Sequence, residues 1–80
     1  MDHGPSRYEL ALRVQAVRLD VYGECGGPML AKQLKVPFRT WMNYEQGVTM
    51  PSEILLLFIE ATGVNPHWLL TGEGSKFASR

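Results

Sequence analysis

The chain has little that would suit a secreted, membrane-spanning or disulfide-stabilised protein. Its 80 residues include a single cysteine, Cys25, so an internal disulfide bond is excluded. The longest uninterrupted apolar run, residues 54–59, is far shorter than the roughly 20 residues that span a bilayer. The first residues show no signal-peptide pattern. We therefore expect a cytoplasmic protein, not associated with a membrane, whose fold is held together by packing alone.

The chain also lacks an excess charge of either sign. Eight Lys and Arg residues are balanced by eight Asp and Glu residues, whereas nucleic-acid-binding domains usually carry a basic excess. The balance is uneven along the chain, because residues 28–49 carry a net charge of +2 and residues 50–74 carry −3. At 45% hydrophobic residues the chain is too apolar for intrinsic disorder. We expect a folded domain with a modest positive face and an acidic back.

Glycine and proline residues divide the chain into five short segments with helical character. Apolar residues recur at helical spacing, and no segment shows the alternation of a half-buried strand. The expected helices cover residues 6–22, 28–34, 37–46, 51–62 and 65–71. The sequence thus predicts one compact all-α domain, a five-helix bundle over residues 1–80, with frayed tails at residues 1–5 and 75–80.

Two of these segments carry specific expectations about packing. In the first, Leu10, Val14, Val17 and Val21 form one apolar stripe that we expect to face the core. The fourth segment is apolar all round, and a helix of that kind is central in the core or part of an interface.

Residues 30–47 have the pattern of a helix-turn-helix unit. A short helix, a tight turn and a second short helix fit into this stretch, with a small residue, Ala31, where two helices would cross closely. Trp41 and Tyr44 are three residues apart and are expected to face inward. The first helix would then brace the unit while the second exposes its outer face.

The sequence resembles the lambda-repressor-like (Xre) group of helix-turn-helix domains, the type found at the N-terminus of phage repressors. Three stretches carry the resemblance: the helix-turn-helix itself, the link Tyr44-Glu45-x-Gly47-x-x-x-Pro51, and the closing string from Gly63-Val64-Asn65-Pro66 to Thr71-Gly72-Glu73-Gly74. The resemblance implies a five-helix domain that binds operator DNA, usually as a homodimer, and regulates transcription.

The chain departs from the family pattern at three places, one of which is a slightly long, glycine-rich link over residues 22–27. The family commonly has glycine where Lys35 stands, because that turn residue often takes a positive φ. Lysine there costs about 1 kcal/mol if the conformation is kept. The second helix is approached through Gly26-Gly27-Pro28, so the phosphate-contacting side chain that the family usually has near the start of this helix is missing.

The resemblance places the DNA-reading side chains on the outer face of the helix around residues 37–46. Arg39 is the best candidate, since arginine can bind guanine O6 and N7 with two hydrogen bonds. Asn43, one turn further on, could pair with adenine or with a phosphate. Phe38 and Met42 could touch thymine methyl groups, although Phe38 could instead pack on the core.

The remaining candidates are expected at the DNA backbone, where contacts position a protein without reading sequence. Each has a plain alternative as an ordinary solvated surface residue. They are Thr40, Gln46, Lys32 and Lys35. With so few cations per chain, a monomer should bind DNA weakly, and useful affinity would need a dimer on two half-sites roughly 34 Å apart.

No residue pattern suggests catalysis, a metal site or a cofactor. His3 and His67 lack acidic or cysteine neighbours at ligand spacing, and Cys25 has no partner that would make it a nucleophile. We therefore do not expect an enzyme. The alternative to DNA binding is a protein-interaction module that retains the fold but has lost sequence-specific DNA binding, as zero net charge and apolar Phe38 and Met42 would suit.

Overall fold

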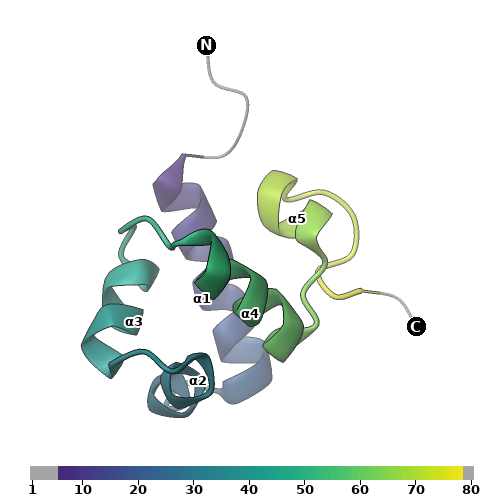
Figure 1. Cartoon of the computed structure of the whole chain (residues 1–80). Helices are drawn as coiled ribbons and strands as arrows, with labels where there is room; N and C mark the ends of the chain where they lie inside the picture. Colours follow the sequence, from purple (N-terminus) through teal and green to yellow (C-terminus); the bar gives the residue numbers. More distant parts are fainter. Residues whose placement is uncertain (1–5, 79–80) are drawn as a thin grey trace.

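A computed structural model describes residues 6–78, which form five α-helices and confirm the predicted all-α bundle (Figure 1). Each helix boundary lies within one residue of the expected one. The helices are α1 (Arg7–Tyr22), α2 (Gly27–Leu34), α3 (Phe38–Glu45), α4 (Ser52–Thr62) and α5 (Pro66–Thr71).

The helix ends lie where they do because local side chains satisfy the backbone there. Ser6 caps α1 with a full capping box, in which its hydroxyl accepts from the Glu9 amide and the Glu9 carboxylate accepts from the Ser6 amide. Asn65 caps α5 by accepting from the His67 amide. Gly63 ends α4 in the left-handed conformation that costs glycine least.

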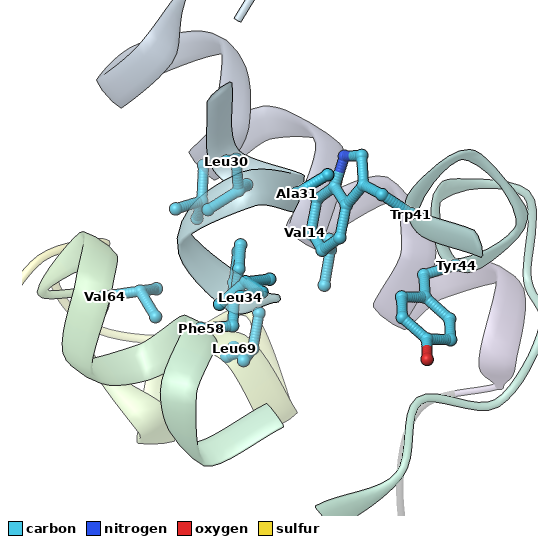
Figure 2. Packing of buried hydrophobic residues seen from close by; sticks show 10 residues of the cluster. Val14, Leu30, Ala31, Leu34, Trp41, Tyr44, Phe58, Val64 and Leu69 are labelled. Atoms are coloured by element: carbon cyan, nitrogen blue, oxygen red, sulfur yellow. The ribbon is translucent and has the colours of Figure 1, made fainter. Parts of the chain in front are cut away.

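The long helix α1 is the centre of the fold, because it packs against each of the other four helices. In Figure 1, α4 crosses α1, while α3 and α5 lie on opposite sides of the molecule. The core between them gathers apolar side chains from all five helices (Figure 2). The buried cluster is Val14, Val17, Leu30, Ala31, Leu34, Trp41, Tyr44, Phe58, Val64 and Leu69.

The fourth segment, expected to be central in the core or part of an interface, is only partly buried. Helix α4 packs mainly against α1 and α2, and Trp41 of α3 stacks on its Phe58. Of its six-residue apolar run only Phe58 is fully buried. Leu56 and Leu57 are 65% and 41% exposed. The long helix α1 occupies the middle of the bundle, so α4 covers one side of α1 and keeps part of its apolar surface exposed.

Residues 75–78 do not form the frayed tail that we expected. This C-terminal strap lies along residues 63–65, where the Asn65 amide donates to the Lys76 carbonyl at 2.8 Å and the Ala78 amide donates to the Gly63 carbonyl at 3.0 Å. An isolated antiparallel bridge joins Val64 and Phe77. The strap therefore closes the bundle beside α5, whereas residues 1–5 and 79–80 lie outside the described part of the chain.

Candidate nucleic-acid interface

Helices α2 and α3 are joined by the short turn of residues 35–37. Lys35 ends α2 with φ 61° and ψ 40°, and within residues 6–78 it is the one non-glycine residue with a positive φ. Its amide donates back to the Ala31 and Lys32 carbonyls. The positive φ that is common at this position in the family the sequence resembles is present at Lys35, so the chain bears the cost of left-handed backbone at a lysine, about 1 kcal/mol.

The inner face of α3 is fixed in the core by two aromatic side chains. Trp41 is 1% exposed and stacks on Phe58 of α4, with ring centroids 5.5 Å apart. Tyr44, also buried, meets Trp41 edge to face at 6.1 Å. The inward orientation predicted for Trp41 and Tyr44 is confirmed, and it determines which side chains of α3 face the solvent.

The outer face of α3 carries the candidate reading residues. Going round the helix at about 100° per residue, five exposed side chains follow one another within an arc of roughly 140°. In that order they are Phe38, Met42, Gln46, Arg39 and Asn43. Phe38 and Met42 are 44% and 43% exposed, and Thr40, half-buried, stands at the border of the arc. We call these six residues the α3 face.

Arg39 within this face, together with Lys32 of α2 and Lys35 at the end of α2, is a cation available to a ligand. Lys32, Lys35 and Arg39 are exposed, and within residues 6–78 none of them has an acidic partner within salt-bridge distance. Glu45, the acidic residue within residues 28–49, is turned inward and pairs with Arg18 of α1. The exposed surface of α2 and α3 is therefore more positive than the net charge of +2 for residues 28–49 suggests.

Arg18 joins α1, α3 and the link between α1 and α2. Its Nε and Nη2 donate to the two carboxylate oxygens of Glu45 at 2.8 and 2.9 Å, and its Nη1 donates to the Gly23 and Glu24 carbonyls at 2.9 and 3.0 Å. The Trp41 indole also donates to Glu45. The hydrogen bonds to Glu45 raise the pKa of Arg18 above its usual value, so its charge persists throughout the pH range of a folded protein.

Arg18 is a buried charge that is absent from the apolar stripe expected for the first helix. That stripe included Val21, but Val21 is 42% exposed, whereas Arg18 is 9% exposed. The signal was present, because Ala11, Val14 and Arg18 have the spacing of one helix face. Arg18 extends that stripe, and its charge is tolerated because Glu45 pairs with it.

The described residues show no further side-chain cap at α2, no cluster of metal ligands and no membrane-spanning helix. At the start of α2, the N-cap Gly26 makes no side-chain cap hydrogen bond, as its lack of a side chain requires. Within residues 6–78 no three His, Cys, Asp or Glu side chains lie together as a metal site would require. None of the helices there combines the length and apolar character needed to cross a bilayer. Trp68 is half-buried beside the core, with the Lys76 ammonium 5.6 Å from its ring centre.

Comparison with protein-family models, with curated proteins and with solved structures gives no match to this chain. Its function is therefore inferred from the residues and geometry described above.

Proposed function

We propose that the protein is a sequence-specific DNA-binding transcriptional regulator of the lambda-repressor-like type. The observation that carries the proposal is the α3 face: five of its six side chains, Arg39 among them, are exposed, while Trp41 and Tyr44 anchor the opposite side of the helix. A short helix presented in this way fits the major groove of B-DNA, which admits one α-helix.

Within this proposal the side chains divide the work by chemistry. Arg39 binds guanine through O6 and N7, and Asn43 binds adenine through N6 and N7. Phe38 and Met42 meet thymine methyl groups. The phosphate contacts, which position the domain without reading sequence, come from Thr40, Gln46, Lys32 and Lys35.

Affinity is limited by the small number of cations, and this supports binding as a homodimer. Each phosphate that a protein neutralises contributes about −0.9 to the slope of log K against log salt concentration. With Lys32, Lys35 and Arg39 as its unpaired cations on this surface, one copy is restricted to a shallow slope. Two copies on half-sites roughly 34 Å apart double the contacts and give the operator a two-fold symmetry.

Selection from a fluorescent duplex library, followed by titration at two salt concentrations, tests the proposal. We expect enrichment of a short palindromic site and weaker binding at the higher salt concentration. Absence of any binding up to about 100 μM at low salt, where non-specific affinity alone is detectable, would contradict it.

Arg39→Ala tests which face reads the bases. Loss of a bidentate arginine–guanine contact costs about 1–3 kcal/mol at one base position, so the variant should relax the preference there and remain folded. Lys76→Ala is the matched control, because it removes one positive charge from the strap, on the side of the molecule away from α3 (Figure 1). If Arg39→Ala selects the same sites with unchanged affinity, the reading face lies elsewhere.

The second candidate function is a protein-interaction module, which the exposure of Phe38 and Met42 favours. In that case Phe38→Ala and Met42→Ala should abolish binding to a protein partner while duplex binding is absent in the parent. The library experiment separates the two functions before any partner is known.

A further inference from the structure

A hollow of about 370 Å³ opens between the link before α2 and the outer edge of α3. It lies above the Arg18–Glu45 pair. Trp41 is almost fully buried and forms part of its floor, while Phe38 and Met42 stand on the α3 side and Pro28 on the α2 side. Its volume is within the range of small-molecule sites, which are mostly apolar with a few polar groups that orient the ligand.

The walls favour a flat aromatic ligand. Phe38 offers ring surface, and the Met42 thioether makes favourable contacts with aromatic rings. The Phe38 ring lies close against Gly27, because a Cβ on Gly27 would lie 2.8 Å from its Cε1 atom. The ring therefore lies across the start of α2 and stands as a wall of the hollow.

The floor favours a hydrogen-bond donor. An ionised carboxylate has about four acceptor positions, and Glu45 uses three of them: Oε2 accepts from the Arg18 Nε and the Trp41 indole, and Oε1 accepts from the Arg18 Nη2. One acceptor position on Oε1 has no protein donor, and Glu45 belongs to the lining of the hollow. Glu24 adds a second carboxylate to the lining, so Arg18 is outnumbered and a negatively charged ligand is disfavoured.

We propose that this hollow binds a small planar aromatic molecule that carries an N–H donor and no negative charge. The ring would lie against Phe38 and Met42, and the donor would reach Glu45 Oε1. Ligand binding in the hollow does not depend on DNA binding. An effector role for the ligand does rest on the proposed function. Because Phe38 and Met42 belong to the α3 face, a bound ligand would compete with DNA for these two side chains.

Titration of the ¹⁵N-labelled protein with indole, followed by NMR, tests the ligand site. We expect a Kd on the order of 1 mM, which suits a fragment of this size, with shifts centred on residues 24–28 and 38–45. The probe 1-methylindole lacks the donor and benzoate carries a negative charge, so both should bind at least several-fold more weakly. Equal binding of all three, no binding of indole, or shifts centred elsewhere would overturn the proposal.

Two matched variants locate the site. Phe38→Ala removes an exposed wall and should weaken indole binding about tenfold, the factor that corresponds to loss of a good aromatic contact. Leu70→Ala removes a similarly exposed apolar side chain from α5, across the molecule from α3, and should leave the Kd unchanged. Equal Kd values for the parent and Phe38→Ala would overturn the site.

A duplex-binding titration with and without indole tests the competition. For a competitive effector at ten times its Kd, apparent duplex affinity falls about tenfold, whereas 1-methylindole at the same concentration has little effect. Unchanged duplex affinity in saturating indole would overturn the effector role. If the parent binds no duplex at all, the proposed function fails while the NMR titration still decides the ligand site, so the two failures are distinguishable.

Discussion

Two ion pairs tie distant parts of the chain to the same end of α1. Arg18 pairs with Glu45 of α3 at 2.8 Å, and Asp20, two residues further on, pairs with Lys76 of the C-terminal strap at 2.7 Å. The distances are nearly equal, but the surroundings differ. The side chains of the first pair are both 11% exposed, whereas those of Lys76 and Asp20 are 34% and 45% exposed.

The difference shows that burial and hydrogen bonding, and not distance, set what an ion pair contributes. Arg18 donates four hydrogen bonds that join three parts of the fold, while Lys76 donates one to Asp20 and otherwise lies beside the Trp68 ring. Breaking the buried pair leaves a charge without a partner in a poorly solvated place, and breaking the exposed pair leaves two charges in water.

The largest effect is expected from Arg18→Ala. Removing one partner of a buried pair typically costs about 3–5 kcal/mol, and here the carbonyls of Gly23 and Glu24 also lose their donor. Urea unfolding followed by circular dichroism measures the loss, with the exposed Arg7→Ala as a control that should change stability by less than about 0.5 kcal/mol.

A second variant keeps this prediction decisive if Arg18→Ala does not fold. Arg18→Lys preserves the charge but cannot occupy both carboxylate oxygens and both carbonyls at once, so it should fold with an intermediate loss. A loss below about 1 kcal/mol in Arg18→Ala would mean that the buried pair contributes no more than the exposed one.

The second largest loss of stability is expected in the link between α1 and α2, whose carbonyls accept hydrogen bonds from Arg18. A Cβ on Gly26 would lie 2.1 Å from the Tyr22 carbonyl oxygen, so Gly26→Ala must move backbone and should cost about 1–3 kcal/mol. Gly27→Ala is the matched control, because its Cβ would meet the tip of the Phe38 ring, a half-exposed side chain that can shift. Equal unfolding midpoints for the two variants would show that the link tolerates displacement and that Arg18 does not fix it.

The sequence predicts features that depend on neighbouring residues. The helix boundaries follow from capping by Ser6 and Asn65 and from glycine at position 63, and the left-handed Lys35 follows from its place in the turn. The exposure of the α3 face follows from the inward spacing of Trp41 and Tyr44. These interactions span a few residues, so the local pattern contains the information.

Features that depend on distant partners were beyond the sequence pattern. Glu45 accepts a hydrogen bond from Trp41 within the same helix, but its main partner, Arg18, is 27 residues away. The strap pairs with residues 63–65 through backbone groups, which residue types do not encode. Likewise, α4 is not central because α1 fills the middle, a competition between helices that neither segment reveals alone.

A smaller change in stability, of opposite sign, is expected from a substitution at Lys35. Lys35→Gly relieves the left-handed backbone, worth about 1 kcal/mol, but glycine also gains entropy in the unfolded chain. The variant should therefore be more stable by less than about 1 kcal/mol, in contrast to the loss at Arg18. Lys32→Ala, at a helical position, should show no such gain. Lower stability of Lys35→Gly in urea unfolding would mean that the lysine side chain makes a stabilising contribution that outweighs the strain.

The smallest effect is expected from the exposed pair. Lys76→Ala should lower stability by about 0.2–1 kcal/mol, including the contact with the Trp68 ring, and a double-mutant cycle with Asp20→Ala isolates the pair itself. Because the screening length is about 3 Å in 1 M salt, the coupling between Lys76 and Asp20 should disappear there. The coupling between Arg18 and Glu45 should persist in a parallel cycle, since salt ions do not reach between buried groups. Equal salt sensitivity of the two couplings would mean that solvent reaches Arg18 as freely as Lys76, and the buried pair would then hold α3 no more firmly than the strap is held.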